Sequence, residues 1–308
     1  MHTILGAGGP VANALTRELM EHNETVRLVS RHEPAIKGEN VSWQKADLLN
    51  YDEVLAAAQG STVIYLCAGL VYNTKIWQHE WPLVIQHVID VVKATGARLI
   101  FFDNVYMYGL VKGPMTEETG IHPVSVKGQV RAKVAGRIMK EVRAGHIRAS
   151  ILRAADFYGS ESLNSFYDMM VLAKYARKQK AMWLGNPKTK HAFTYVPDAA
   201  RAMFLLGQHP ECDNQIWHAP TAPALTGQQF IELASNAFQV EPKYGKVNKF
   251  MLRMVGMFNK LMREMVEMFY QYDHDYVFAS NKFESYFNIQ PTPYEVGVKH
   301  LSQTLFKE

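Results

Sequence analysis

Cysteine is scarce in this chain of 308 residues, which contains only Cys67 and Cys212. The two residues form no C-x-x-C pair, so the sequence predicts neither a disulfide framework nor a zinc site. The histidines also lack the spacing of metal ligands, and we therefore expect no bound metal. With so little cysteine, the expected location is the cytoplasm.

Long hydrophobic runs and blocks of like charge are missing as well. No stretch reaches the roughly 18 apolar residues that would span a bilayer, and no basic leader precedes the first predicted strand. The formal net charge is only +4, with Lys and Arg scattered among the acidic residues. We therefore expect no membrane partner and no nucleic-acid partner, and an anionic small molecule as the ligand.

A glycine-rich stretch at residues 3–12, Thr-Ile-Leu-Gly-Ala-Gly-Gly-Pro-Val-Ala, predicts a buried strand, a tight turn and a helix. Gly6 lets the backbone turn sharply, Gly9 leaves room for a pyrophosphate, and Ala12 lets the helix pack on the strand. The helix N-terminus would offer N–H groups and a positive dipole end to the phosphates. The predicted cofactor contacts in this stretch are Gly6, Gly8, Gly9, Pro10, Val11 and Ala12.

Strands and helices alternate through the first half of the chain. The predicted strands are 3–5, 26–30, 41–47, 62–69, 98–102 and 149–152, and the helices between them include 51–59, 81–93 and 126–143. Strands that alternate with helices at this spacing predict an α/β protein of the Rossmann type with a doubly wound parallel sheet.

The regular alternation stops near residue 160. We expect residues 1–160 to form the dinucleotide-binding domain, with 190–218 returning to it. Residues 161–189 and 219–308 should then form a small, mostly helical lobe that selects the substrate. Within this lobe, Thr226 and Gln229 fit a capping box that starts a helix at 227–238.

The end of the second predicted strand bears on the choice of cofactor. NAD sites usually place an acid there to bind the ribose 2′-OH, whereas an arginine accommodates a 2′-phosphate. This chain has Ser30 and Arg31 at that point. Because a guanidinium pairs well with phosphate, the sequence favours NADP(H) over NAD(H), unless Arg31 is only a solvated surface residue.

Several motifs in the right order resemble the extended short-chain dehydrogenase/reductase superfamily, the family of NAD(P)-dependent epimerases and dehydratases. Gly6-x-x-Gly9-x-x-Ala12 is similar to its glycine motif, and residues 105–109, 152–159, 193–202 and 287–293 resemble further family segments. The resemblance implies additional cofactor contacts after the third and fourth strands. These are Asp47, Leu48, Cys67, Ala68 and Gly69.

The chain departs from this family at the catalytic residues. Asn104 stands where the family has a Ser or Thr that binds the reacting oxygen. The family's Tyr-x-x-x-Lys pair is also missing from residues 123–133, which contain no tyrosine. One register of this segment puts Lys127 and Arg131 in the two places, and a shift of two residues gives Gln129 and Lys133.

Two interpretations of these cations stay open at this stage. Lys127 and Arg131 would lie on one face of a helix, so a neighbouring charge could lower the pKa of Lys127 and suit it to proton transfer. Asn104 would then donate its amide N–H to a substrate oxygen. In the other interpretation both cations bind the cofactor or face solvent, and Tyr106 or Tyr108 is the proton donor.

The leading functional hypothesis is an NAD(P)-dependent oxidoreductase, or an epimerase or dehydratase, that transfers hydride to or from a carbonyl or secondary alcohol of a small molecule. The alternative is a non-catalytic sensor or regulator that binds NADP(H). The resemblance also implies a homodimer through helices 81–93 and 126–143 of each subunit.

Methionines recur at threes late in the chain, within an amphipathic stretch at residues 251–268. We expect them to pack in a helical core. A flexible pocket wall is the second interpretation, because thioethers adapt to many shapes. A membrane-surface helix is the third, disfavoured because the cations Arg253, Lys260 and Arg263 are balanced by Glu264 and Glu267.

Overall fold

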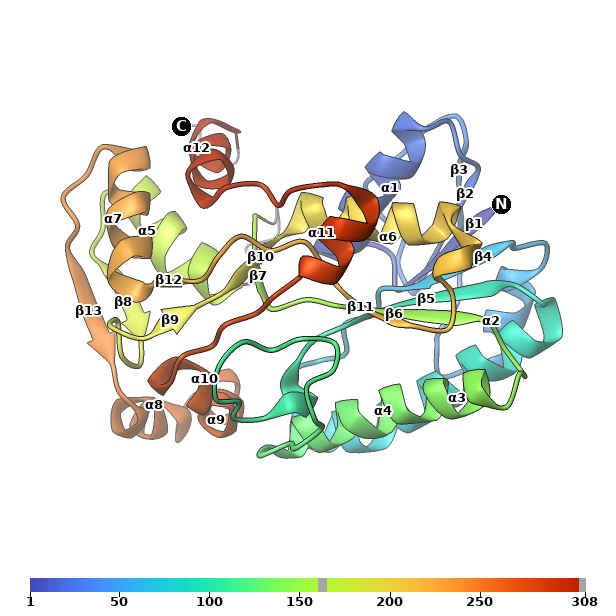
Figure 1. Ribbon diagram of the computed structural model, residues 1–308, viewed down its shortest axis with the longest axis horizontal. Coiled ribbons are helices and arrows are strands. Elements are labelled where there is room, and N and C mark those ends of the chain that lie inside the picture. Colours follow the sequence, from blue (N-terminus) through green and yellow to red (C-terminus); the bar gives the residue numbers. More distant parts are fainter. Residues whose placement is uncertain (160–164, 305–308) are drawn as a thin grey trace. The chain divides into compact units, whose positions relative to one another are not determined.

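The computed structural model describes residues 1–159 and 165–304 (Figure 1). The chain divides into two units. Unit 1 contains Met1–Met107, Lys127–Arg153 and Ala199–Trp217. Unit 2 contains Tyr108–Val126, Ala154–Asp198 and the residues from His218 onward.

A seven-stranded sheet forms the centre of unit 1, with the order β11-β6-β5-β4-β1-β2-β3. The five pairings from β6 to β3 are all parallel. The order reverses between β1 and β4, which is the position where open α/β sheets bind ligands beyond their carboxyl ends. The strands are β1 (His2–Leu5), β2 (Val26–Ser30), β3 (Val41–Lys45), β4 (Val63–Leu66), β5 (Arg98–Asp103), β6 (Ala149–Arg153) and β11 (Ile216–His218).

Helices flank this sheet because its strands are apolar on both faces. The largest core cluster joins strand residues such as Leu66, Phe101 and Ile151 to α2, α3 and α4, which together cover one face. The helices of this unit are α1 (Pro10–Glu21), α2 (Tyr51–Ala58), α3 (Thr74–Thr95), α4 (Val126–Arg143) and α6 (Val196–Gln208), with short turns η1 (Tyr106–Tyr108) and η3 (Pro210–Cys212). The predicted doubly wound fold is confirmed.

Unit 2 combines short strand pairs with helices around a second, aromatic-rich core. The pairs β10–β7 and β13–β8 are parallel, and β12–β9 is antiparallel. The strands are β7 (Asp156–Tyr158), β8 (Ala181–Leu184), β9 (Lys190–His191), β10 (Phe193–Tyr195), β12 (Leu225–Thr226) and β13 (Tyr244–Val247). The helices are the π-helix η2 (Asp168–Leu172), α5 (Ala173–Ala176), α7 (Gly227–Phe238), α8 (Lys249–Gly256), α9 (Lys260–Met265), η4 (Val266–Met268), α10 (Tyr270–Asp273), α11 (Asn281–Phe287) and α12 (Tyr294–Thr304).

The residue boundaries of the two units differ from those of the predicted domains. Residues 108–126, 154–159 and 190–198 group with unit 2, whereas we expected them in the dinucleotide-binding domain. The segments β7 and β10 account for part of this shift, since they pair with each other instead of joining the central sheet. The expected boundary at residues 160–161 lies outside the described residues.

Helix α3 begins seven residues before the predicted start at Trp81. Asn73 caps it, with a side chain that accepts hydrogen bonds from the N–H groups of Lys75 and Ile76. Pro82 therefore lies inside the helix. None of the described helices has both the length and the apolar character that crossing a membrane requires.

The methionine-rich segment does not pack as a single core helix. It breaks into α8, α9 and η4, and Met251, Met254 and Met257 are exposed. Only Met268 is buried, while Met262 and Met265 are partly buried against a small cluster. The prediction of core packing is therefore wrong for the first three methionines.

Candidate functional site

The turn after β1 is built by glycine. Gly6 has a φ of +86°, and a Cβ on it would lie 2.6 Å from the backbone N of Ala68, so a larger residue cannot fit. The N–H groups of Gly6 and Ala7 both donate to the carbonyl of Val29 at 3.0 Å, which fixes the turn against β2. By contrast, a Cβ on Gly8 or Gly9 would meet no atom within 4 Å.

Helix α1 starts directly behind this turn. Gly9 is its N-cap, and Pro10, which has no N–H, occupies the first position. The first helical hydrogen bond runs from the N–H of Asn13 to the carbonyl of Gly9 at 2.9 Å. The N–H groups of Val11 and Ala12 therefore precede the helical hydrogen-bond ladder, and together with the helix dipole they suit an anion.

This turn and helix start, residues 6–12, will be called the glycine cradle. Its open space above Gly8 and Gly9 fits the pyrophosphate of a dinucleotide, because the backbone there can be approached closely. The predicted helix–strand packing is also present, since the Ala12 side chain is buried. The residue contacts with the cofactor themselves stay predictions.

Ser30 and Arg31, at the end of β2, lie in different environments. The Ser30 hydroxyl donates to the carbonyl of His32 at 2.6 Å and accepts from the indole N–H of Trp43 at 3.2 Å. Arg31 next to it is exposed. Ser30 is thus held within its loop, and the Arg31 guanidinium is accessible to a phosphate.

The segment after β3 carries the expected adenine contacts. One carboxylate oxygen of Asp47 accepts from the N–H of Leu49 at 3.0 Å, and the carbonyl of Leu48 accepts from His87 Nδ1 at 3.0 Å. Both residues are half-buried. The loop that carries them is therefore fixed at both positions.

The turn after β4 is lined by small groups. Burial raises the pKa of the Cys67 thiol far above its ordinary value, and its Sγ lies 3.9 Å from the Sδ of Met203. Cys67 therefore acts as a small apolar side chain and not as a nucleophile. Ala68 is the residue that Gly6 approaches, and a Cβ on Gly69 would meet no atom within 4 Å.

The two registers considered for residues 123–133 differ in burial along helix α4. Lys127 and Arg131 are buried, whereas Gln129 and Lys133 are exposed. Lys127 Nζ donates to Thr74 Oγ1 at 2.8 Å and lies 4.7 Å from the centroid of the Tyr72 ring. The register with Lys127 and Arg131 is therefore the one that faces the interior of unit 1.

Arg131 is held by a buried carboxylate. Its Nε donates to Asp103 Oδ1 at 2.7 Å, and its NH2 group contacts the same oxygen. The guanidinium carbon lies 4.3 Å from the Trp81 ring centroid and 4.9 Å from that of Phe101. Arg131 is thus fixed by an ion pair and by ring stacking, which suits a structural role more closely than contact with a ribose.

Asp103 is the residue whose importance sequence reasoning missed. Besides Arg131, its Oδ1 accepts from the N–H of Asn104 at 2.8 Å, and its Oδ2 lies 3.9 Å from Arg153 Nε. Asp103 is at the end of β5 and Arg153 at the end of the neighbouring β6, where the two pair in register. The parallel pairing expected for these two strands was the signal that could have placed Asp103 beside Arg153.

Asn104 and Tyr106 follow β5. The side-chain carbonyl of Asn104 accepts from the N–H of Tyr106 at 3.1 Å, which leaves its NH2 group as the donor for a ligand. The Tyr106 ring stacks on Trp77, with centroids 6.3 Å apart. Asp103, Asn104, Lys127 and Arg131, with Thr74 and Tyr72, will be called the polar corner.

Tyr108 belongs to unit 2 and has a structural environment. Its hydroxyl lies 2.8 Å from His218 Nε2, and His218 Nδ1 lies 2.8 Å from the carbonyl of Ala279. Since a carbonyl only accepts, Nδ1 carries the proton and Tyr108 donates to Nε2. Tyr108 is buried and its proton is engaged in this bond, which disfavours it as a proton donor to substrate.

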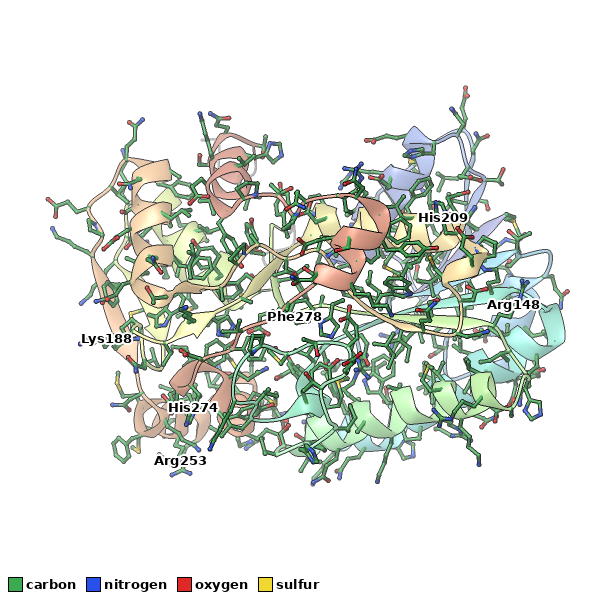
Figure 2. The ribbon with its side chains drawn as sticks, viewed as in Figure 1. Arg148, Lys188, His209, Arg253, His274 and Phe278 are labelled. Atoms are coloured by element: carbon green, nitrogen blue, oxygen red, sulfur yellow. The ribbon has the colours of Figure 1, made fainter. Side chains whose placement is uncertain are left out.

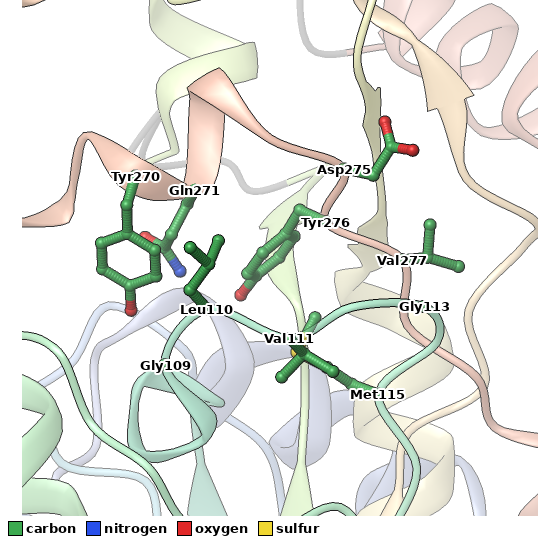
Figure 3. Close-up of a pocket in the computed structure, with 10 residues that line it drawn as sticks. All are labelled: Gly109, Leu110, Val111, Gly113, Met115, Tyr270, Gln271, Asp275, Tyr276 and Val277. Atoms are coloured by element: carbon green, nitrogen blue, oxygen red, sulfur yellow. The ribbon is translucent and has the colours of Figure 1, made fainter.

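A small cavity in unit 2 lies next to this region (Figure 3). It has a volume of about 10 Å³ and is lined by residues 109–111 on one side and by Tyr270, Gln271 and Tyr276 on the other. The amide nitrogen of Gln271 is buried and has no hydrogen-bond partner among the described residues. A single water molecule would fill the cavity, so it is too small for a substrate.

Comparisons with known proteins agree with the Rossmann-type fold and the glycine cradle. The family model described as NAD dependent epimerase/dehydratase family matches residues 2–218. The comparison with curated proteins gives no match. Similar solved structures share the fold at low sequence identity.

Three of these structures span almost the whole chain. A Thermus thermophilus UDP-glucose 4-epimerase in complex with NAD is 14% identical, with 99% of each chain covered and a TM-score of 0.77. DesIV, a dTDP-glucose 4,6-dehydratase from Streptomyces venezuelae with NAD bound, is 13% identical, with 98% and 96% covered and a TM-score of 0.80. MoeE5, solved with UDP-glucose and NAD, is 16% identical, with 98% and 97% covered and a TM-score of 0.77. Because the family model covers well over half of its residues, the chain belongs to the NAD-dependent epimerase/dehydratase family.

Proposed function

We propose that this protein is an NAD(P)-dependent oxidoreductase, or an epimerase or dehydratase, that acts by hydride transfer on a carbonyl or secondary alcohol. The observation that carries the proposal is the glycine cradle, where Gly6 is sterically required and the space above Gly8 and Gly9 is open. When bound, the dinucleotide supplies or accepts the hydride. The protein would hold its phosphates with the N–H groups at the start of α1.

In this proposal Lys127 takes the place of the family's tyrosine as the proton-transfer group. Its Nζ is positioned by Thr74 Oγ1 and by the Tyr72 ring, and Asn104 offers an amide N–H to the reacting oxygen. Asp103 neutralises Arg131, so that cation positions the corner but does not act on the substrate.

The cofactor proposed is NADP(H), because Arg31 is accessible at the end of β2. Calorimetric titration with NADPH and with NADH tests this directly. We expect tighter binding of NADPH, and an Arg31→Ala variant should lose most of that preference while its affinity for NADH changes little. The matched control is Arg17→Ala on α1, which should bind both cofactors as the wild type does. Equal affinity of the wild type for both cofactors would contradict the NADP(H) preference.

Turnover tests the catalytic part. NAD(P)H absorbance would be followed with sugar nucleotides of the kinds in the titles of the similar structures, UDP-glucose and dTDP-glucose, and with simple carbonyl compounds. Lys127→Met should lower kcat about 100-fold or more, the usual size of general acid–base catalysis, with cofactor affinity unchanged. Lys133→Met, an exposed change on the same helix, serves as control. A fully active Lys127→Met enzyme would rule out this role.

A non-catalytic sensor is the second candidate function, favoured because Arg131 is sequestered by Asp103 and no tyrosine stands at Lys127. This candidate predicts dinucleotide binding without turnover of any compound in the panel. Binding alone therefore does not separate the two functions, whereas turnover does.

The homodimer through α3 and α4 also stays a proposal. These helices are linked within unit 1, since Arg137 NH1 donates to the carbonyl of Pro82 at 3.4 Å, and Leu83 next to it is exposed. Light scattering of the wild type at micromolar concentration should give twice the mass of the chain, and Leu83→Lys should shift the protein to the monomer. A monomeric wild type would exclude this interface.

A further inference from the structure

The two short helices α8 and α9 form a hairpin that packs on a small apolar cluster of unit 2 (Figure 1). Asn248 and Asn259 cap the helices, accepting from the N–H groups of Met251 and Met262. A Cβ on Gly256 would lie 3.0 Å from the Cα of Arg263, so the helices approach each other closely at that point. Leu252 anchors the hairpin in the cluster with Leu184, Phe269 and Tyr272.

The opposite side of the hairpin is apolar and exposed. Its members are Phe250, Met251, Met254, Val255, Met257, Phe258 and Leu261. Phe258, at the connection between the two helices, has 91% of its surface exposed, and Phe250 has 70%. Large apolar side chains gathered in this way on a protein surface usually mark an interaction site.

Cations predominate in the sequence of this hairpin and of the strand before it. From Pro242 to Arg263 the sequence contains no Asp or Glu. The same span contains six exposed cations, which are Lys243, Lys246, Lys249, Arg253, Lys260 and Arg263. Among them, Lys243 forms an ion pair with Glu241, just before the span, at 2.6 Å. Arg253 lies at the outer edge of these helices (Figure 2).

The acids that follow in the sequence are less exposed than these cations. Glu264 and Glu267 are only half-exposed, and Glu267 accepts the backbone N–H of Val126 at 2.8 Å. The balance of charge along the sequence had suggested otherwise. The structure thus weakens the reason for disfavouring a membrane-surface helix.

We propose that the α8–α9 hairpin docks on the surface of a membrane that contains anionic lipid. Phe258 and Phe250 would enter the headgroup boundary, and the six cations would contact the phosphates and other anionic headgroups. This arrangement is peripheral and reversible, and it replaces our expectation of no membrane partner. A second copy of the chain fits the face poorly, because a twofold contact would bring two sets of six cations together.

Vesicle flotation tests the proposal with the full chain. Vesicles of phosphatidylcholine with 30% phosphatidylserine should carry the protein to the top of the gradient, and pure phosphatidylcholine vesicles should not. Raising the salt from 0.1 to 0.5 M should reduce binding at least fivefold, because the electrostatic part is screened. Phe250→Ser/Phe258→Ser and, separately, Arg253→Glu/Lys260→Glu should each reduce binding about tenfold or more.

Matched controls carry the same changes elsewhere on the protein. Val296→Ser/Tyr286→Ser alters two other exposed apolar residues of unit 2, and Lys140→Glu/Arg148→Glu alters two exposed cations of unit 1. Both should float like the wild type. Brominated lipid should quench additional fluorescence in a Phe258→Trp variant, which reports insertion at that position.

Three outcomes would overturn the proposal. The first is failure of the wild type to bind anionic vesicles. The second is binding that survives both hairpin variants. The third is self-association in analytical ultracentrifugation that Phe250→Ser/Phe258→Ser abolishes without any vesicle binding by the wild type, since this would assign the face to a second copy of the chain.

Discussion

The glycine cradle and the polar corner follow parallel strands of one sheet, yet they are built from different parts of the chain. The cradle is made by backbone: a positive φ at Gly6, a close approach to Ala68 and free N–H groups at the start of α1. The corner is made by side chains, which pair across the ends of β5, β6 and α4. The backbone-built site keeps the glycine motif of the family. The site built from side chains can change its residues and their pairing while the fold stays the same.

The largest expected effect is in the corner, where Asp103→Asn would leave the buried Arg131 and Arg153 without their carboxylate. Removing one partner of a buried ion pair costs about 3–5 kcal/mol of the free energy of unfolding. Chemical denaturation followed by circular dichroism would measure it. Asp273→Asn, at an exposed position, should change the value by less than about 0.5 kcal/mol. Similar small changes for both variants would mean that the corner is not held by this carboxylate.

The next effect is in the cradle. Gly6→Ala would force a side chain into a positive φ and against the backbone of Ala68. We expect a loss of about 2–4 kcal/mol in the free energy of unfolding, from backbone strain and overpacking together. Gly145→Ala has a similar φ of +74° but open space around the Cβ, so it should show the strain alone, about 1–2 kcal/mol. Equal losses would show that the approach to Ala68 is unimportant.

The Gly9→Ala variant should weaken dinucleotide binding while leaving the free energy of unfolding almost unchanged. The residue has an extended backbone and open space, so the free energy of unfolding should change by less than about 0.5 kcal/mol. If the cradle holds a pyrophosphate, the added methyl group should weaken dinucleotide binding about tenfold or more, measured by calorimetry. Gly136→Ala on the exposed side of α4 is the control for affinity. Undiminished affinity in Gly9→Ala would move the phosphates away from this turn.

The smallest expected effect concerns His2 and the pH dependence of stability. His2 lies on β1, in the sheet that carries both sites. Burial lowers the pKa of His2 on β1 below its ordinary 6.5, although Glu24 lies 3.2 Å from it. The unfolded chain therefore binds more protons below pH 6.5, and the free energy of unfolding should fall as the pH drops through 6.5. In His2→Gln this fall between pH 7 and pH 5 should be smaller by about 1 kcal/mol or less, whereas the exposed His32→Gln should match the wild type. Parallel pH profiles for wild type and His2→Gln would contradict the assignment.

Local signals made much of the fold predictable. The glycine cradle, the strands that follow it, helix α4 and the capping box of Thr226 and Gln229 all depend on residues close together in the sequence. Helix α3 was predicted to start at Trp81, whereas it starts seven residues earlier, after the N-cap Asn73. Local residue types therefore fixed the elements, with errors mainly at their ends.

The corner depends on residues far apart in the chain, so it could be predicted only in part. The sequence offered Lys127 in one of two registers, but its contact with Thr74, 53 residues away, required the arrangement of α3 beside α4. Predicting the pairing of Arg131 with Asp103 likewise required the position of β5 relative to α4. In unit 2, strand pairs as short as β12–β9 lack the length that gives a clear alternating pattern.

The shared carboxylate of Asp103 also limits how this corner can change over evolutionary time. Replacing Arg131 by lysine, the family's residue, would exchange a planar fork for a point charge and lose the stacking on Trp81 and Phe101. Replacing Lys127 by tyrosine would put a ring into a fully buried position already bordered by Tyr72 and Thr74. Each of these single replacements is thus unfavourable by itself, because the residues of the corner depend on one another structurally.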